Sequence, residues 1–528
     1  MSTVVTPSPE TRGKLTLIDA MLDEQGDLTA VDRFTQFHEG EKSPLQGGLY
    51  SSLLPVRAPG PGQQYAFEVD LDRCSGCKAC VAACHSMNGL DEFEAWREVG
   101  LIVGAIAGLP VLQHVTSACH HCLDPACLSA CPVDAYEKDP VTGIVKHLDD
   151  QCFGCQYCTL ACPYDVPKFH AKKGIVRKCD MCSDRLEVGE APACAQACPH
   201  EAIKIRVIDR EEAVAVAESN SFLATAPAAD YTMPTTRYLS SRPAPGPVRA
   251  GDYFRNEPEH AHLPLVVMLV LTQASAGGYL FEAVSRAMGG DVTTTLPWLS
   301  LVVGLVGIHA SLLHLGRPLY AYRALIGLRH SWLSREVAAF GLFANVALGH
   351  AAALWFQPRW LGLSAAAAAA TGLLAVFCSV MVYHVVRRPF WRGGRCAAKF
   401  FGTSIVLGLA GAFATSGGAP RLAIALTIAT GLKLALEGAI LRHLRDPQMT
   451  SLRRTALLLR GPLSRVAALR LGLGLAGGAI VPLVFATVAV PEAAAWVALA
   501  AVLGGELAER YLFFAAVVRP KMPGGLAS

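Results

Sequence analysis

Charged residues are scarce in this sequence. Only 17% of its 528 residues are Asp, Glu, Lys or Arg, whereas 52% are hydrophobic. Soluble domains carry about 25% charged residues, so this composition predicts a membrane part. The formal net charge is only +3, and the basic residues of the second half gather at the ends of apolar segments. A nucleic-acid partner is therefore not expected, because nucleic-acid binding needs a basic face.

The beginning of the sequence lacks an export signal. The first residues, MSTVVTPSPETRGKLTLIDAM, contain neither an apolar core of signal-peptide length nor a twin-arginine pair. We therefore expect the first half of the chain to stay in the cytoplasm. The chain also lacks a Rossmann glycine-rich turn, a pterin-binding domain and an obvious substrate-pocket signature. It is thus not expected to transform a substrate without a catalytic partner.

Cysteine is almost absent outside one stretch of the chain. Sixteen of the 18 cysteines lie between Cys74 and Cys198, and the other two are Cys378 and Cys396. The sixteen form four groups: Cys74, Cys77, Cys80, Cys84; Cys119, Cys122, Cys127, Cys131; Cys152, Cys155, Cys158, Cys162; and Cys179, Cys182, Cys194, Cys198.

The spacing of these groups indicates iron–sulfur clusters. The first and third groups have the bacterial ferredoxin spacing C-x2-C-x2-C-x3-C, and a proline follows the last cysteine of the second, third and fourth groups. Three closely spaced thiolates wrap one cubane, and the fourth reaches the second cluster of a pair. Zinc sites, the alternative, usually have two separated pairs of ligands. Four complete groups predict four 4Fe–4S clusters held by all sixteen thiolates.

Proline- and glycine-rich stretches divide the chain. Residues 1–64 form an N-terminal arm with a candidate helix near Leu15 to Leu22, and it either docks on a partner or packs on its own domain. We expect an iron–sulfur domain over 65–240, a linker over 241–260 containing SRPAPGPVRAG, and a membrane anchor over 261–528. The predicted fold class is an α+β ferredoxin-like domain with two pseudo-repeated two-cluster modules, followed by an all-α bundle of eight transmembrane helices.

The apolar half contains eight segments long enough to cross a hydrocarbon core of roughly 30 Å. They lie near His262 to Val284, Leu296 to Leu315, Glu336 to Phe356, Leu361 to Val386, Phe400 to Gly418, Leu422 to Leu441, Val466 to Val488, and Ala493 to Phe514.

The basic loops predict the orientation of these spans. Arginine and lysine concentrate in residues 237–255, 317–335, 387–399, 442–465 and 519–521, all on the side of the N-terminus. The opposite loops contain only Arg286, Arg359 and Arg421. By the positive-inside rule, the iron–sulfur half faces the cytoplasm of a multi-pass protein in the cytoplasmic (inner) membrane. This agrees with the missing export signal.

Ionisable residues within the spans are candidates for function, because their insertion into a bilayer is costly. His309, His314, Glu336, His384, Lys433, Glu437 and Glu506 fall in the half nearest the cysteine-rich domain, and His350 falls in the far half. A quinone needs hydrogen-bond donors and a titratable group, for which we favour His314 and Glu336 over a role as helix caps.

The other ionisable residues allow two alternatives. Lys433 and Glu437, four residues apart, are either a structural ion pair or, with Glu506, part of a proton path. A b-type haem would need two facing histidines, and His309, His350 and His384 lie on three different spans. His350 is at the wrong depth to face either of the other two.

The stretch from Arg73 to about Ile205 resembles the four-cluster electron-transfer subunits of molybdopterin oxidoreductases, such as dimethyl sulfoxide, polysulfide and sulfite-oxidising enzymes. The motifs that carry this resemblance are CSGCKACVAACH, HHCLDPACLSACPVDA, QCFGCQYCTLACPYDVPKF and KCDMCSDRL with PACAQACP. The resemblance implies four ligand sets: Cys74, Cys77, Cys80 and Cys198; Cys179, Cys182, Cys194 and Cys84; Cys119, Cys122, Cys127 and Cys162; and Cys152, Cys155, Cys158 and Cys131.

The segment SLLHLGRPLYAYRALIGLRHSWLSREV resembles the anchor subunit of dimethyl sulfoxide reductase, and the likeness extends more weakly over the second half. That family has eight spans, oxidises quinol and lacks haem. The resemblance implies a quinol site at His314 and Glu336 with Arg317 as a neighbour, and no haem.

Together these patterns predict an electron-transfer and membrane-anchor protein. It would pass electrons between the quinone pool and a molybdopterin-containing catalytic subunit. A module of a hydrogenase or formate dehydrogenase and a redox-driven ion transporter are the alternatives.

Overall fold

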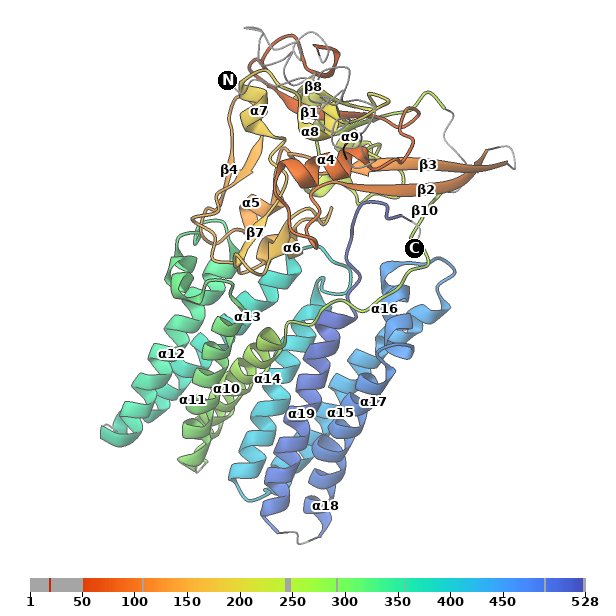
Figure 1. Ribbon diagram of the computed structural model, residues 1–528. Helices are drawn as coiled ribbons and strands as arrows, with labels where there is room; N and C mark the ends of the chain where they lie inside the picture. Colours follow the sequence, from red (N-terminus) through yellow and green to blue (C-terminus); the bar gives the residue numbers. More distant parts are fainter. Residues whose placement is uncertain are drawn as a thin grey trace, which may run out of the picture.

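The computed structural model describes Asp19 and residues 51–525, with gaps at 107–108, 243–247, 291–292, 357 and 489–490. Figure 1 shows a domain of strands, short helices and loops on one end of a bundle of long helices. The expected arm over residues 1–64, with its helix near Leu15 to Leu22, lies mostly outside the described residues. Its described end starts with η2 (Ser51–Leu53), and Leu53 packs in the core of the cysteine-rich domain.

A three-stranded sheet of order β8-β1-β9 organises the cysteine-rich domain. β1 (Gln63–Asp70) pairs antiparallel with β8 (Ile203–Asp209) and parallel with β9 (Arg237–Leu239). The apolar residues Phe67 and Val69 of β1 are buried. Because β1 precedes the first cysteine group and β8 follows the last, this pairing brings the two ends of the cysteine-rich sequence together.

A second sheet includes part of the expected linker. β2 (Glu98–Ile106) and β3 (Leu109–Ser117) form an antiparallel hairpin, and β10 (Arg249–Ala250) pairs with β2. Arg249 and Ala250 of the segment 241–260 therefore belong to a sheet of the cysteine-rich domain, whereas Asn256 and Glu259 bond the helical half.

One local order occurs twice around the second and third cysteine groups. A short helix, a Cys-Pro step and a two-stranded hairpin follow one another in each case. The elements are α5 (Ala126–Ala130) with β4 (Tyr136–Lys138) and β5 (Val145–His147), and α6 (Tyr157–Ala161) with β6 (Lys168–His170) and β7 (Ile175–Arg177). The other helices of the domain are α4 (Ala79–Met87), α7 (Ser183–Glu187), α8 (Ala193–Gln196), α9 (Arg210–Glu218) and η3 (Ala229–Tyr231).

The second half of the chain is helical. Its long helices are α10 (Leu263–Ala287), α11 (Thr295–Ala310) continued by η4 (Ser311–His314), α12 (Trp332–Phe356), α13 (Leu361–His384), α14 (Gly394–Thr415), α15 (Pro420–Gly438) continued by η7 (Ala439–Arg445), α17 (Ser464–Leu475) continued by the π-turn η8 (Ala476–Ile480) and α18 (Val481–Thr487), and α19 (Ala493–Ala515). The shorter elements are η5 (Pro318–Leu325), η6 (Pro358–Trp360) and α16 (Ser451–Arg460).

Seven helices among the described residues are long and apolar enough to cross a membrane, and they correspond to the first seven expected spans. The eighth expected span, near Ala493 to Phe514, is the 23-residue helix α19. It is not among the seven, and it contains Glu506, Glu509 and Arg510 close together. The structure thus supports a multi-pass membrane protein.

The two halves share a buried interface. Tyr157 and Ala161 of α6 belong to the same hydrophobic core as residues of α10, α12 and α13. The Tyr157 hydroxyl donates a hydrogen bond to Val382 O at 2.8 Å. This contact fixes the third cysteine group directly over the helix ends.

The C-terminal segment returns to the cysteine-rich domain after α19, as Figure 1 shows. Arg519 contacts Asp165 Oδ1 at 2.7 Å and Glu259 Oε2 at 2.5 Å. Leu101 N donates to Gly524 O at 3.2 Å. The segment therefore ties the two halves together a second time.

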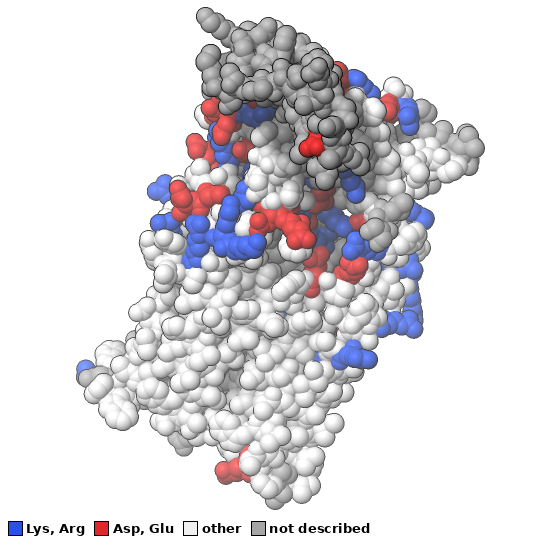
Figure 2. Space-filling model, viewed as in Figure 1, with Lys and Arg blue, Asp and Glu red and all other residues white. Residues whose placement is uncertain are grey.

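The charged side chains mark the same division. On the face shown in Figure 2, Lys, Arg, Asp and Glu gather over the cysteine-rich domain and where it meets the bundle, while the rest of the bundle is almost uncharged. An uncharged band of this kind suits contact with lipid.

Candidate functional site

The structure gathers the sixteen cysteines into four sets that each combine two motifs. Three sets each line one small cavity: Cys74, Cys77, Cys80 and Cys198; Cys119, Cys122, Cys127 and Cys162; and Cys131, Cys152, Cys155 and Cys158. These are three of the sets that the family resemblance implies.

The fourth set is Cys84, Cys179, Cys182 and Cys194. Burial raises the pKa of the Cys84 thiol to about 12, and the nearby Cys194 and Cys182 thiols add to the increase. Burial likewise raises the pKa of Cys179, with further contributions from Cys84, Cys119 and Cys194. The helices that contain Cys84 and Cys194, α4 and α8, pack against each other.

Left-handed backbone in the first and third motifs lets the protein turn around each cavity. Gly76 and Gly154 have φ angles of 76° and 72°, which favour glycine. A Cβ atom at Gly154 would lie 2.3 Å from Gly174 O. The sequence Cys-x-Gly-Cys therefore places two thiols on one loop that a larger residue would obstruct.

The cavities fit iron–sulfur clusters. A cubane offers one iron to each of four thiolates, and each of the three cavities above is bordered by four cysteines. Among the described residues, no group of three or more His, Cys, Asp or Glu is arranged to hold a metal ion. Thiols spread around a space in this way suit a cluster better than one zinc ion. When bound, such clusters transfer single electrons.

Two buried cations between the sets were missed by the sequence analysis. Arg97 is only 2% exposed, and its pKa is raised by Cys194 and Cys80 against the opposing effect of burial. Its Nη1 donates to Thr116 Oγ1 at 3.0 Å, but Nε and Nη2 have no hydrogen-bond partner among the described residues. Lys178, also buried, donates to Cys179 O at 2.9 Å. Both cations can offset the negative charge of cluster-bound thiolates.

A cavity of about 330 Å³ lies where the third motif meets the bundle. This volume is within the range of small-molecule sites, roughly 300–1,000 Å³. The cysteine-rich domain contributes Phe153, Cys155, Gln156, Tyr157 and Leu160 to its wall. The bundle contributes His262, His309, His314, Glu336 and Tyr383 among mainly apolar residues.

Both histidine and carboxylate candidates of the sequence analysis line this cavity. His314 ends η4, and its Nε2 lies 3.2 Å from Cys155 O. Glu336, near the start of α12, is 6% exposed and accepts a short hydrogen bond from Ser379 Oγ. The lining of the cavity therefore includes both a cluster cysteine and a buried carboxyl group.

Arg317, the third candidate, does not line this cavity. Its guanidinium donates to backbone carbonyls of the cysteine-rich domain, at 3.1 Å to Asp149 O, 3.4 Å to Cys152 O and 3.2 Å to Lys173 O. Arg317 therefore fastens the loop after η4 to the third motif.

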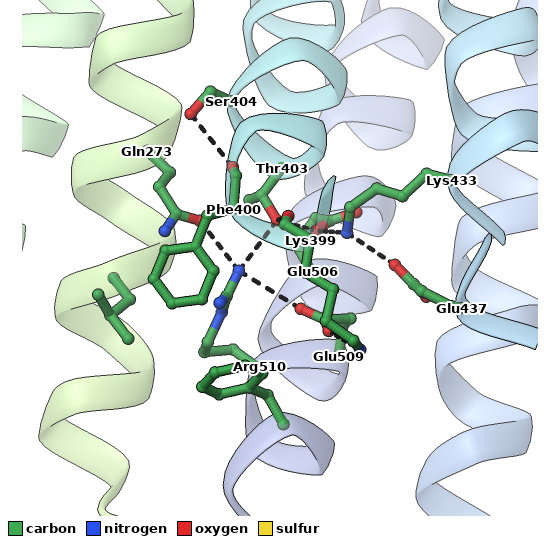
Figure 3. A network of polar contacts seen from close by, with 12 residues as sticks. Gln273, Lys399, Phe400, Thr403, Ser404, Lys433, Glu437, Glu506, Glu509 and Arg510 are labelled. Carbon is green, nitrogen blue, oxygen red and sulfur yellow. Dashed lines mark hydrogen bonds and ion pairs between the residues drawn. The ribbon is translucent and has the colours of Figure 1, made fainter. Parts of the chain in front are cut away.

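A second polar centre lies within the bundle, and Figure 3 shows most of it. The expected pair is present, with Lys433 Nζ 2.8 Å from Glu437 Oε1. It belongs to a larger network of four cations and three carboxylates on α14, α15, α17 and α19: Lys399, Lys433, Arg470, Arg510, Glu437, Glu506 and Glu509. Each carboxylate is matched by at least one cation, although Glu509 Oε2 and the Nε and Nη1 atoms of Arg510 have no hydrogen-bond partner among the described residues. A larger cavity, of about 490 Å³, adjoins it, but no cysteine is among the described residues that line that cavity.

The far half of the bundle contains an ionisable cluster that the sequence analysis did not anticipate. His350 Nε2 lies 3.0 Å from Glu282 Oε1, and both side chains are fully buried. Arg286 Nε donates to the same Glu282 oxygen at 2.8 Å, and His350 Nδ1 lies 2.8 Å from Ser364 Oγ. Both ring nitrogens of His350 are thus engaged, which leaves none to bind haem iron.

The thiol sets, the cavity beside them and the helical bundle define an iron–sulfur electron-transfer protein joined to a membrane anchor. Residues 111–208 match the family model of the 4Fe-4S dicluster domain, and residues 258–515 match that of the DMSO reductase anchor subunit (DmsC).

Curated relatives match the first half of the protein. The B subunit of the anaerobic dimethyl sulfoxide reductase of Haemophilus influenzae is 34% identical over 181 residues, which cover 33% of this sequence and 87% of the relative. The protein therefore belongs to the family of dimethyl sulfoxide reductase iron–sulfur subunits, fused here to a segment of the DmsC anchor family.

Two other relatives have different names. The hydrogenase-2 operon protein HybA of Escherichia coli is 34% identical over 228 residues, covering 37% of this sequence and 68% of the relative. The thiosulfate reductase electron transfer subunit PhsB of Salmonella typhi is 37% identical over 152 residues, covering 28% of this sequence and 79% of the relative. Similarity to the iron–sulfur half is therefore shared by subunits of several redox enzymes.

Proposed function

We propose that this protein passes electrons between a quinone in the 330 Å³ cavity and a catalytic partner, through four 4Fe–4S clusters. One observation carries the proposal: His314, Glu336 and Cys155 line the same cavity. A quinone there would meet two groups that exchange protons and one wall of a cluster site. The mainly apolar remainder of the lining suits the body of a lipid-soluble molecule.

We assign one oxygen of the quinone headgroup to His314 and the other to Glu336. A quinone headgroup has an oxygen at each end, and each oxygen needs a hydrogen-bond partner and a proton during the reaction. His314 supports one oxygen next to the third motif. Glu336, held by Ser379, supports the other from α12. The carbonyl contacts of Arg317 keep the third motif at the cavity.

The four sets extend away from the membrane as two two-cluster modules. The inner module contains the second and third motifs, whose helix–hairpin order repeats, and the outer module contains the first and fourth. Cys77 of the first set is exposed. We therefore place the exchange of electrons with the partner at the outer module, and expect the arm over residues 1–64 to contribute to docking.

The proposed partner is a molybdopterin-containing catalytic subunit. The named relatives that support it are subunits of dimethyl sulfoxide and thiosulfate reductases. A hydrogenase module is the second candidate, because a hydrogenase-2 operon protein is also similar. Purification of the complex with mass spectrometry of its subunits separates these two candidates.

We also propose eight membrane spans, with α19 as the eighth, and an iron–sulfur domain on the cytoplasmic side of the inner membrane. The ion pairs of Glu506 and Glu509 support α19 as a span, because paired charges are less costly in a bilayer. The basic loops at the iron–sulfur end support the orientation. Cysteine-labelling reagents that do not cross membranes would test it at Arg359→Cys and Arg445→Cys, of which only the first should react in intact cells.

The test of the quinone site is Glu336→Gln. The amide retains a partner for Ser379 but cannot exchange protons, so electron transfer from a quinol analogue to the clusters should slow by about 100-fold or more. Iron content should stay at four clusters per molecule. Glu492→Gln, at the far end of α19, is the control. Unchanged electron transfer in Glu336→Gln would refute the assignment.

A further inference from the structure

A quinone site within a bundle needs a route for protons. Conversion of a quinol to a quinone breaks two O–H bonds, and the two electrons leave through the clusters while two protons must reach water. Glu336 is only 6% exposed and cannot deliver them itself. The described side chains of the cavity that can hold a proton are Cys155, Tyr157, His262, His309, His314, Glu336 and Tyr383.

Among these described side chains, His262 is in contact with a further titratable residue that lies nearer to the solvent. The ring of His262 lies edge-on to that of His314, with centroids 4.7 Å apart. On its other side it stacks on His260, at 5.1 Å. His260 is exposed where the bundle meets the cysteine-rich domain. His309, in contrast, binds Leu305 O of its own helix through Nδ1.

We propose that His262 and His260 form a proton path from the quinone cavity to the aqueous side of the iron–sulfur domain. This inference rests on the quinone site proposed above. In the oxidative direction each proton moves from the headgroup to His262, then through water to His260, and then to bulk water. In the reductive direction the same groups supply the two protons that the quinone takes up.

The charges around His262 suit a group that passes a proton on. Burial lowers the pKa of His262 to about 4, with contributions in the same direction from the neighbouring His314, His260 and Arg519. Arg519 comes from the C-terminal segment, where Asp165 and Glu259 neutralise it. His262 is therefore uncharged at neutral pH, so it accepts a proton only briefly and does not retain it.

The test compares His262→Gln and His260→Gln with wild type and with His443→Gln, a histidine of η7 paired to Asp446. The full-length protein in lipid nanodiscs is mixed without oxygen with a water-soluble quinol analogue, and the bleaching of the clusters is followed. We expect about tenfold slower bleaching in both path variants. The final extent of bleaching should not change in either variant, and the binding of a fluorescent quinol-site inhibitor should not change in His260→Gln, because His260 does not line the cavity.

Two further measurements separate proton transfer from a structural role. Imidazole in the buffer should restore most of the rate of His262→Gln, and the rate of each path variant should depend more strongly on buffer concentration than that of wild type. Equal rates in wild type and both variants would overturn the path. Loss of inhibitor binding without rescue by imidazole would also overturn it, in favour of packing. If wild-type clusters are not reduced by quinol at all, the quinone site itself is wrong.

Discussion

The substitution Glu506→Gln tests whether the bundle network is structural. Glu506 is fully buried, and its Oε2 lies 2.6 Å from Lys433 Nζ while its Oε1 lies 2.8 Å from Arg470 Nη2. The neutral amide would leave four cations with two carboxylates. Breaking a buried ion pair from one side costs about 3–5 kcal/mol. At about 2–4 °C per kcal/mol for a large domain, that loss lowers the unfolding temperature by roughly 6–20 °C.

The assay is the temperature at which half of the detergent-solubilised protein has aggregated, because unfolding of such proteins is usually irreversible. Glu492→Gln is the matched control on the same helix. The double variant Glu506→Gln/Lys433→Met should recover more than half of the loss, because Arg470 still bonds Glu437 at 2.9 Å. If the unfolding temperature of Glu506→Gln falls by less than about 2 °C while ion transport across the membrane is impaired, the structural role is refuted and a transporter is favoured.

Two further predictions concern the cysteine-rich domain. Arg97→Gln removes a buried cation beside the first and fourth motifs, so the reduction potentials of the clusters should fall by about 40 mV, or roughly 1 kcal/mol for one electron. A redox titration followed by electron paramagnetic resonance measures this change, with Arg57→Gln, outside the core, as the control. Equal potentials in Arg97→Gln and wild type would contradict the charge-balancing role. Removal of residues 519–528 deletes the contacts of Arg519 with Asp165 and Glu259. The truncated protein should be cut faster by protease between its two halves, and equal resistance would show that the segment does not hold them together.

The sequence predicted the features that depend on local spacing. The first and third cysteine groups predict shared clusters because each places three thiols within seven residues. His314 and Glu336, which line one cavity, were chosen because a membrane restricts ionisable residues to few places. The combination of the first motif with the fourth came from family resemblance, since it depends on the pairing of β1 with β8, which lie far apart in sequence.

Features that depend on the docking of the two halves could not be predicted. Arg317 was expected beside the quinone, yet its guanidinium binds the carbonyls of Cys152 and Lys173, which only the docked domain supplies. His262 was taken only as the start of a span. Glu282 lies inside the first expected span and was missed although it met the criterion for ionisable residues, whereas its pairing with His350, 68 residues away, had no local signal. Likewise, the strand pairing of β10 lies in a segment whose composition indicates a linker.

The shared wall of the 330 Å³ cavity has a consequence for how the protein can be divided. Phe153 and Leu160 come from one half of the protein, and His314 and Glu336 come from the other. A separately produced anchor would therefore lack the part of the cavity wall that the cysteine-rich half supplies, and a separately produced ferredoxin half would lack the part that the bundle supplies. The proposed quinone site therefore needs both halves of the protein, and the covalent fusion guarantees that each anchor always meets its own cysteine-rich domain.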